Sequence, residues 1–561
     1  MINRTPTNTP YPLNITGSST FGRYPKISLE KTYNMFVSDQ FSVPYAGYKI
    51  GIENKSFLDA MQGRALHASV KLNKMIGVFD QNVFLIDINF NQVTLKVTGY
   101  LVTKIGELQT NKGVVYITEN NKPQICISDG VSLYVYDTTL SPSFQTVTTN
   151  FIPGYIYFHD TYILCAATAD GTYSPPANNT WRLSGQNDAT TFPDDGAHVG
   201  LLETKPDNTQ AVVRVPSKGN LIFVFGRDVV EPWYNVGYQL FPYQRNTNFN
   251  CDFGCLNPAT IASLDTMVVW LAINEKSGPV VMYSDGGEPI RITTDGFDYV
   301  LSNLQNPSDA QAFMFRQDGH IFYHINFYTD NLSFYIDFLA DGTQRIYHAC
   351  DENNNYFIAS EVAFFNNQYY FISRNNGNLY VFDTRFTTYD GKQIPRIRVC
   401  KNVRNIDQTF FVATDVGFTI ESGNTNYYQQ SLGNIQLTTV SGDYLVSTGG
   451  PIYLTAQDGT YLLAMDGKYL VESNVASDDF DYLVTTQEAY TYSTPRVDLS
   501  ISVDGGENFS SYIPFELPPI GKRTNRLKWW QLGIANDLIC QFRFYGFGRF
   551  VCTDGEVNTR Q

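Results

Sequence analysis

The stretch LIFVFGRDVVEPWY, residues 221–234, has a layout that recurs along most of the chain. Five apolar residues run without a break, Gly226-Arg227-Asp228 supplies a turn, and a second apolar segment follows. The pattern predicts a β-hairpin whose ladder stops at Pro232. Because apolar residues occupy both odd and even positions, both faces of the first strand should be covered, which places this hairpin between other sheets.

The composition favours strands and turns over helices. Aromatic residues make up 15% of the 561 residues, with 38 Tyr and 39 Phe, and Gly, Asn, Asp and Thr crowd the gaps between apolar runs. A chain of this length predicts two or three domains. No apolar run approaches the length of a membrane span or of a secretory signal, so we expect a soluble protein without membrane insertion.

The charge argues against a protein that grips nucleic acid. The net charge of -15 and a pI near 4.9 do not suit a surface that binds phosphates through clustered Lys and Arg, although DNA could slide past an acidic wall. The eight cysteines have no paired spacing, and we expect reduced, mostly buried thiols and assembly in a cytoplasm. They are Cys126, Cys165, Cys251, Cys255, Cys350, Cys400, Cys540 and Cys552.

The hairpin unit repeats between residues 63 and 390. Units begin near residues 75, 114, 155, 221, 267, 313 and 362, so five of the six spacings lie near one value. A period of about 40 to 50 residues with several strands is the size of a propeller blade. We predict a β-propeller of six or seven blades, with residues 167–217 as a loop insertion and the strand near Tyr33 as a candidate to complete the last blade. The alternative is an irregular β-rich protein with accidental spacing.

The flanking segments have a different character. Residues 1–23 are rich in Thr, Asn, Pro, Ser and Gly and predict a flexible arm that orders on a neighbour. Residues 24–62 predict one strand and a sharp corner. In residues 391–561, apolar and polar residues alternate more regularly, which predicts a β-sandwich platform whose strands have one solvent-exposed face. Within it, an eight-residue repeat at about 450–475, with units ending in Asp-Gly, predicts an inserted β-element.

Several carboxylates are candidates for glycoside hydrolysis, which needs two of them facing one cleft. The pairs Asp228 with Glu231 and Asp285 with Glu288 lie at strand ends, and we interpret them as turn residues. The segment 502–509, SVDGGENF, resembles the Asp-box turn of sialidases, in which the Asp and Gly fold a hairpin and do no catalysis.

Two residue pairs have partial metal-ligand spacing. His320 and His324 would point to one face of a strand, but no further ligand joins them at a suitable spacing. Cys251 and Cys255 lack a second Cys or His pair. We interpret all four as structural. The sequence therefore gives no catalytic, cofactor-binding or metal-binding residues, and we expect no cofactor.

A series of short motifs follows in a fixed order from about residue 30 to 550. Together these motifs resemble the packaged-DNA stabilisation protein family of short-tailed bacteriophages, also called the tail hub or nozzle. They are Asn34-Met35-Phe36, Pro44-Tyr45-Ala46-Gly47-Tyr48, Asn220 to Gly226, Glu231-Pro232-Trp233, Gly254-Cys255, Trp270-Leu271-Ala272, Arg291-Ile292-Thr293-Thr294, the turn at Ser502, and Arg526 to Gly533.

The resemblance implies a β-propeller and a β-sandwich platform in a homohexameric ring below the portal-adaptor complex. It implies that the ring retains packaged DNA, conducts it during ejection and anchors tail fibres or spikes, whereas a tail needle or plug stays open as a further partner. It implies a virion protein assembled in the host cytoplasm, with no enzyme activity.

The repeat at residues 453–471 and the segment 167–217 depart from the family pattern and leave the fibre and needle partners open. Two other classes also stay open, a propeller enzyme that hydrolyses surface glycans and a host-receptor-binding tail protein.

Overall fold

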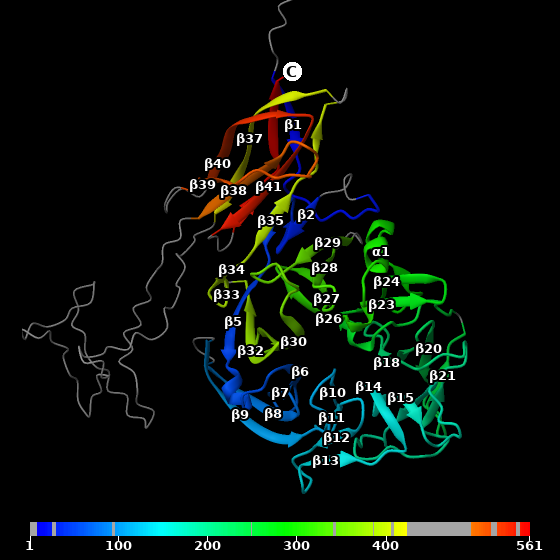
Figure 1. Ribbon diagram of the computed structural model, residues 1–561. Helices are drawn as coiled ribbons and strands as arrows, with labels where there is room; N and C mark the ends of the chain where they lie inside the picture. Colours follow the sequence, from blue (N-terminus) through cyan, green and yellow to red (C-terminus); the bar gives the residue numbers. More distant parts are fainter. Residues whose placement is uncertain are drawn as a thin grey trace, which may run out of the picture.

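The computed structural model is an all-β protein with a ring of sheets at one end and a platform of two sheets at the other (Figure 1). The prediction of an all-β propeller protein is confirmed. The structure describes residues 8–24, 30–91, 96–247, 249–339, 344–384, 386, 388–405, 409–422, 495–517, 524–545 and 550–560.

The hairpin that begins at residue 221 forms as predicted. β19 (Leu221–Phe225) pairs antiparallel with β20 (Val230–Asn235). All five residues of β19 are buried. One face of the strand packs into a cluster that includes Trp270 of the next blade, and the other face into a cluster that includes Trp181 of the preceding blade. Both faces of this strand are therefore covered, as the unbroken apolar run indicates.

The ladder does not stop at Pro232, and that part of the prediction is wrong. Pro232 lies inside β20, opposite Phe223. Its carbonyl accepts the Asn246 N–H at 2.8 Å, so its missing N–H faces the same side, just beyond the end of the neighbouring strand β21 (Tyr243–Arg245). A proline is tolerated there because no ladder hydrogen bond is lost.

Seven four-stranded units form the ring, within the predicted range of six or seven. Their innermost strands lie next to one another around the ring. The first three blades comprise β6 (Gly63–Ser69), β7 (Lys74–Phe79), β8 (Asn82–Asn91) and β9 (Lys96–Glu107); β10 (Tyr116–Glu119), β11 (Ile125–Ser128), β12 (Leu133–Tyr136) and β13 (Phe144–Val147); and β14 (Phe151–His159), β15 (Tyr162–Asp170), β16 (Thr180–Leu183) and β17 (Val199–Leu201).

Blade 4 adds β18 (Ala211–Arg214) to β19, β20 and β21. The last three blades comprise β22 (Ala262–Leu264), β23 (Met267–Asn274), β24 (Ser277–Ser284) and β25 (Ile290–Arg291); β26 (Gln311–Gln317), β27 (His320–Phe327), β28 (Leu332–Phe338) and β29 (Gln344–Ala349); and β30 (Ala359–Phe365), β31 (Gln368–Ser373), β32 (Asn376–Asp383) and β5 (Gly47–Ile52).

The last blade is closed by β5, which precedes the first blade in the sequence. β5 runs antiparallel to β32, with Tyr48 opposite Phe382. The Tyr48 ring stacks on Tyr389 at a centroid distance of 4.5 Å and packs edge-on against Phe371. The strand near Tyr33, β2 (Lys31–Tyr33), does not complete this blade but pairs with β29 and with the platform.

The predicted loop insertion at residues 167–217 is also wrong. The segment contains β16, β17 and β18, which belong to blades 3 and 4. The Pro- and Asp-rich connections of this segment are held in place by hydrogen bonds between buried polar groups. The buried Asp170 carboxylate accepts Arg182 Nε–H at 2.8 Å and Thr180 Oγ1–H at 3.0 Å. The wide spacing in the sequence thus reflects long connections between ordinary blade strands.

The platform consists of two sheets packed face to face, which share one apolar core that includes Phe418, Trp529 and Phe542. One sheet holds β1 (Asn8–Leu13), β43 (Gly555–Arg560), β37 (Phe411–Ser422), β42 (Phe550–Cys552), β4 (Phe41–Pro44) and β3 (Met35–Ser38), with β40 (Thr524–Ala535) on β37. The other runs on from blade 6 through β2 to β35 (Arg396–Val399), β41 (Asp537–Tyr545), β38 (Arg496–Ser502) and β39 (Ile513–Glu516), with β36 (Val403–Arg404) on β41. β33 (Thr388–Tyr389) and β34 (Lys392–Gln393) extend blade 7.

The N-terminal segment is part of this platform, which corrects the prediction of a flexible arm for its residues 8–23. β1 forms a six-residue antiparallel ladder with β43. Leu13 and Ile15 are buried in the platform core, so the core needs this segment of its own chain. The predicted repeat at about 450–475 lies outside the described residues.

Helical structure is sparse in the described part of the chain. α1 (Asp295–Ser302) follows blade 5, and its N-cap Thr294 accepts the Phe297 N–H at 3.3 Å. Three single-turn helices are η1 (Asn54–Phe57), η2 (Pro258–Thr260) and η3 (Pro307–Asp309). Across the described ranges, no helix combines the length and the apolar character that crossing a membrane requires.

The packing of β19 between two blades predicts a large cost for truncation there. Phe223→Ala removes a fully buried phenyl ring and should lower the free energy of unfolding by about 3–5 kcal/mol. The neighbouring blades are held in a closed circle and cannot move inward to fill the cavity that the substitution leaves. Urea unfolding followed by tryptophan fluorescence measures this change. Leu240→Ala, at a side chain 81% exposed, is the control and should change it by less than about 0.5 kcal/mol. Equal effects from the two variants would contradict the packing described.

Candidate functional site at the propeller–platform junction

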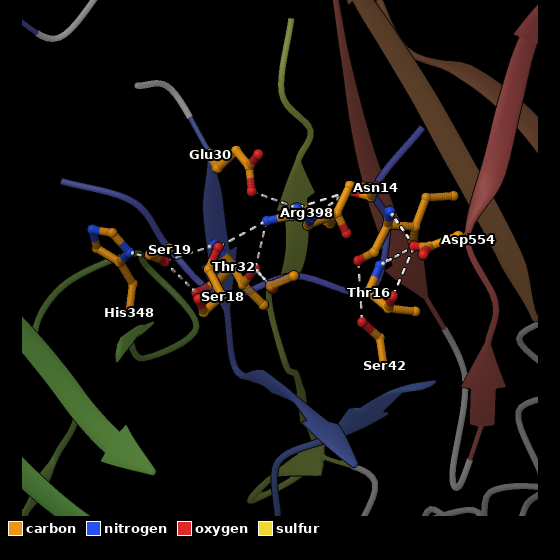
Figure 2. A network of polar contacts seen from close by, with 12 residues as sticks. Asn14, Thr16, Ser18, Ser19, Glu30, Thr32, Ser42, His348, Arg398 and Asp554 are labelled. Carbon is orange, nitrogen blue, oxygen red and sulfur yellow. Dashed lines mark hydrogen bonds and ion pairs between the residues drawn. The ribbon is translucent and has the colours of Figure 1, made fainter. Parts of the chain in front are cut away.

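Residues 13–23, which we call the strap, connect the platform to the propeller through a chain of polar contacts (Figure 2). At the platform end, Leu13 and Ile15 are buried in the core. At the propeller end, the Phe21 ring packs edge-on against Phe297 and Phe334, at centroid distances of 4.7 and 5.8 Å. The strap therefore spans the two halves of the molecule.

The platform end of the strap is held by Asp554. Its carboxylate accepts the backbone N–H groups of Ile15 and Thr16 at 2.9 and 2.8 Å and the Thr16 hydroxyl at 2.7 Å. The Ser42 hydroxyl donates to the Ile15 carbonyl at 3.2 Å. Backbone donors and acceptors of the strap thus find side-chain partners where no strand pairing is available.

The middle of the strap wraps around the buried guanidinium of Arg398, from β35. All of its donor nitrogens are used. They donate to the carbonyls of Asn14 and Ser18 at 2.8 and 3.2 Å and to the Thr32 hydroxyl at 3.1 Å, and they form an ion pair with Glu30 at 3.0 Å. A Cβ at Gly17 would overlap the guanidinium, so this close approach requires glycine.

The propeller end is held by Ser19. Its N–H donates to the Ile346 carbonyl in β29 at 2.9 Å. Its hydroxyl accepts the Thr32 N–H at 3.0 Å and lies 2.8 Å from His348 Nδ1. Burial, with a smaller contribution from nearby Lys31, lowers the pKa of His348 to about 3. His348 therefore stays neutral between pH 5 and 8, and this contact does not switch with pH in that range.

Asn34 forms a second bridge beside the strap. Its left-handed backbone, with φ of 52°, turns the chain between β2 and β3. Its side-chain amide donates to the carbonyls of Cys350 and Pro395 at 3.1 and 2.9 Å and accepts the Cys350 N–H at 3.1 Å. This one side chain thus joins blade 6 to the segment that leads into β35.

The predicted histidine pair has partners within the propeller. His320 Nδ1 lies 2.9 Å from an Asp337 oxygen, and His324 Nδ1 lies 3.0 Å from the Tyr45 hydroxyl. His324 stacks on Phe313 at 4.7 Å, and burial lowers the pKa of His324 to about 3. Among the residues that the structure describes, no three His, Cys, Asp or Glu side chains are placed to share a metal ion. Both histidines act in packing.

All eight cysteines lie in described parts of the chain, where they are buried and unpaired. Cys251 forms an isolated backbone bridge with Val230, and the Cys255 N–H donates to the Gly226 carbonyl at 2.8 Å. Burial raises the pKa of the Cys255 thiol to about 12, so its reactive thiolate form is disfavoured. The backbone groups of these two residues thus help to hold the turn of the β19–β20 hairpin.

The candidate carboxylate pairs do not form an acid/base site. Glu231 is fully buried, and its carboxylate accepts N–H groups from Glu203, Thr204 and the Trp233 ring at 2.9, 2.6 and 3.1 Å. Its neighbour Asp228 lies in the adjoining turn. Asp285 and Glu288 are exposed in the connection between β24 and β25. Glu231 therefore holds a loop, Asp228 lies in a turn, and the second pair lies on the surface.

The Asp-box-like segment is a turn between β38 and β39. The Asp504 carboxylate accepts the Glu507 and Asn508 N–H groups at 3.1 and 3.0 Å and the Ser502 hydroxyl at 2.6 Å. Together with the Asn508 side chain, the Ser502 hydrogen bond and the backbone donors hold the pKa of Asp504 well below its usual range. The aspartate folds the turn, as the sequence comparison with Asp boxes implies.

Sequence reasoning missed the residues of the strap site. Arg398 lies in an alternating stretch that predicts a strand with one solvent-exposed face, but its side chain is buried. Its partner Glu30 lies 368 residues away in the sequence, and its partner Asn14 lies 384 residues away. No local pattern marks such a pairing. The glycine at position 17 is the nearest signal, and it stands in a segment rich in turn-forming residues.

A half-buried carboxylate lies at the seam of the propeller. Glu361 in β30 accepts the Leu66 N–H in β6 at 2.9 Å, which joins the last blade to the first. Enclosure between the innermost strands raises the pKa of Glu361 to about 8. The rings of Tyr116 and Tyr155, from the next two innermost strands, lie 4.6 Å apart.

Comparisons with known proteins give one family. A family model described as bacteriophage P22 Gp10, beta-propeller, matches residues 88–387, from β8 in the first blade to just past β32 in the last. No curated protein matches the chain.

Three solved structures that match this chain show a weak likeness to it. The N-terminal domain of Nup159 is 10% identical to this chain, with a TM-score of 0.38, and the match covers 62% of this chain and 96% of the Nup159 domain. The Myceliophteria thermophila Cps50 (Swd1) β-propeller domain is 8% identical, with a TM-score of 0.36, and the match covers 60% of this chain and 99% of that domain. A Trichoderma reesei carbohydrate-active enzyme of family AA12 is 12% identical, with a TM-score of 0.32, and the match covers 65% of this chain and 99% of that enzyme chain.

Arg398→Met should destabilise the junction strongly. The substitution keeps much of the side-chain volume but leaves the Glu30 carboxylate and the strap carbonyls without their donor, a loss of about 3–5 kcal/mol for a buried pair. Urea unfolding gives the loss, and hydrogen exchange should show faster exchange at residues 14–20 first. Arg526→Met, at a side chain 71% exposed, is the matched control and should leave both measurements near wild type. Unchanged exchange in the strap of Arg398→Met would contradict the role assigned to Arg398.

Glu361→Gln should remove a pH dependence of stability. The folded chain keeps a proton on Glu361 up to about pH 8, whereas the unfolded chain loses it near the ordinary value of 4.5. Stability from this group is therefore full below pH 4.5 and falls as the pH rises toward 8. The amide of Gln can still accept the Leu66 N–H, so the variant should be more stable than wild type at pH 8 and have a flatter profile. Parallel profiles of wild type and variant, from melting temperatures at pH 5 to 8.5, would rule this out.

Proposed function

Because this chain belongs to the bacteriophage P22 Gp10 β-propeller family, whose members are tail-hub proteins, we propose that it is the tail nozzle of a short-tailed bacteriophage. In this proposal, six copies form a ring below the portal-adaptor complex. The ring retains the packaged DNA, conducts it during ejection, and anchors tail fibres or spikes. The observation that carries the proposal is the family match over residues 88–387, which spans most of the propeller.

The charge distribution supports the role in conducting DNA. Residues 63–390 contain 19 basic and 32 acidic residues, and 19 − 32 gives a net charge of −13 out of the −15 of the whole chain. A surface of this sign repels phosphate, so DNA that passes it does not adhere. Screening at cellular salt limits this repulsion to about 8–10 Å from the wall. The channel therefore guides DNA at close range without sequence-specific contacts.

The strap supports the role in retaining DNA. A ring that holds a packaged genome carries a mechanical load, and a hinge between propeller and platform would dissipate it. The buried contacts of Arg398 and the Asp554 hydrogen bonds tie the strap to the platform, while Ser19 and Phe21 tie it to the propeller. Each subunit therefore acts as one stiff element of the ring.

A structural role, rather than an enzymatic one, suits the polar residues singled out above. A glycan hydrolase needs two accessible carboxylates across a cleft. The Glu231 carboxylate accepts hydrogen bonds from a neighbouring loop, and the Asp504 carboxylate accepts hydrogen bonds from its own turn. The buried, unpaired thiols fit assembly in a reducing host cytoplasm before the protein becomes part of the virion tail. A needle or plug would close the ring from below.

The oligomeric state tests the proposal. The purified chain, alone and mixed with its portal-adaptor complex, should give rings of six by mass photometry and negative-stain imaging, at the latest when the adaptor is present. The adaptor complex without this chain is the control and should show no such ring. A chain that stays monomeric, or that forms trimers without regard to the adaptor, would exclude the nozzle.

Loss of the protein should release the genome. Particles packaged in its absence should lose DNA to added nuclease, while particles completed with the purified chain should keep it. Equal DNA content in the two preparations would contradict a role in retention.

A further inference from the structure

Four large apolar side chains lie exposed at one end of a platform sheet. Trp530 and Ile534 of β40 are 63% and 65% exposed, and Phe410 and Val412 beside them are 71% and 40% exposed. Val412 lies directly opposite Ile534 in the β37–β40 ladder. The neighbouring Trp529 is only 4% exposed and packs into the core, so the two consecutive tryptophans point to opposite sides of the sheet. We call Phe410, Val412, Trp530 and Ile534 the apolar face.

The charged side chains around the apolar face balance one another. Lys528 lies 2.9 Å from Asp415, and Arg526 lies 3.5 Å from Glu556. Charge therefore does not select what covers the apolar face, and a segment with apolar side chains and little charge suits it. The outer side of the sheet carries three acidic and three basic residues, Asp415, Glu421, Glu556, Arg526, Lys528 and Arg560.

The N-terminal strand β1 begins in the same row of the sheet as the apolar face. Asn8 pairs with Arg560 of β43, and Arg560 pairs with Val412 of β37. Because Val412 pairs in turn with Ile534, one line of neighbours crosses four strands. Neighbouring strands lie about 4.8 Å apart, so the backbone of Asn8 is about 10 Å from that of Val412 and about 14 Å from that of Ile534.

The residues before β1 can reach this face. Residues 1–7, MINRTPT, lie outside the described part of the chain. An extended chain covers about 3.3 Å per residue, so Ile2, which precedes Asn8 by six residues, can lie up to about 20 Å from it. A tether this short gives an effective concentration on the order of millimolar. The reach therefore favours the apolar face of the same chain over that of a second copy.

The sequence of residues 1–7 suits a neutral, apolar surface. Met1 and Ile2 are apolar, and Arg4 is the single charged side chain of the segment. Methionine is unbranched and packs favourably against aromatic rings. Proline is favoured at the second position of a β-turn, so Pro6 favours a turn over residues 5–8 that directs residues 1–4 back over the sheet.

We propose that residues 1–4 fold back over the apolar face of their own chain, with Ile2 against Val412 and Ile534. The proposal concerns the single chain and does not depend on the ring of the proposed function. Burial of the apolar side chains stabilises the contact. The contact also shields Trp530 and removes from the surface an apolar patch that would favour association of newly made chains with one another.

Disulfide trapping tests the contact and identifies the chain that supplies it. The double variant Ile2→Cys and Ile534→Cys is treated with oxidised glutathione at low protein concentration, while the native thiols stay buried. We expect a disulfide between positions 2 and 534 in a species with the mass of one chain. Ile2→Cys with Leu240→Cys, at an exposed position between β20 and β21, is the control and should give no such bond.

Every other result of the trapping experiment overturns the proposal. A disulfide that joins two chains would show that residues 1–4 cover the face of a neighbouring copy. The absence of a disulfide between positions 2 and 534 would show that these residues lie elsewhere.

Tryptophan quenching gives an independent readout with the native cysteines alone. All five tryptophans lie in described parts of the chain, and Trp530 is exposed whereas the other four are buried. If residues 1–4 cover Trp530, acrylamide should quench the wild-type chain weakly, and Ile2→Asp should raise the quenching constant at least twofold. Thr7→Asp adds the same charge outside the contact and should behave as wild type. The effect of Ile2→Asp should vanish in a Trp530→Phe background. Equal quenching of wild type and Ile2→Asp would contradict the contact.

Discussion

The arrangement of the two halves depends on one buried guanidinium. Arg398 has five N–H groups, and all five donate, to carbonyls of the strap, to Thr32 and to Glu30. A buried cation is costly to desolvate, and it is tolerated because every donor has an acceptor in good geometry. The strap has no strand partner along this stretch, so the guanidinium stands in for one. Beside the sheet that runs on from blade 6 through β2 to β35, platform and propeller thus share a polar centre made by β35 and the N-terminal segment.

Much of the propeller could be predicted because its signal is local. Each β-hairpin has its apolar runs and turn within about 20 residues, as at residues 221–235, and the repeat follows from their spacing. The unbroken apolar run of β19 correctly indicated cover on both faces. The prediction failed where a composition rich in Pro, Asn and Thr was read as a sign of a flexible arm or a loop. Residues 8–23 and 167–217 have this composition, yet buried hydrogen bonds and an ion pair hold them in place.

The strap site could not be predicted because its partners are remote in sequence. An arginine in an alternating strand normally faces water, and nothing within ten residues of Arg398 indicates that the N-terminal segment covers it. The same reason explains the misplaced closing strand. Tyr33 and Tyr48 stand in similar apolar stretches, and only the aromatic neighbours supplied by blade 7, Phe371 and Tyr389 among them, place β5 rather than β2 in the last blade.

The pairing of β1 with β43 has a consequence for synthesis. Asn8 pairs with Arg560, so β1 leaves the ribosome some 550 residues before its partner strand exists. At the usual rate of about 5–20 residues per second, the wait lasts on the order of half a minute to two minutes. An unpaired strand exposed for that time would add to any open sheet edge of another nascent chain. β1 contains Pro10 and Pro12, which lack the N–H that such wrong pairing requires. The prolines thus disfavour wrong pairing along the edge of β1 on which their N–H groups would lie.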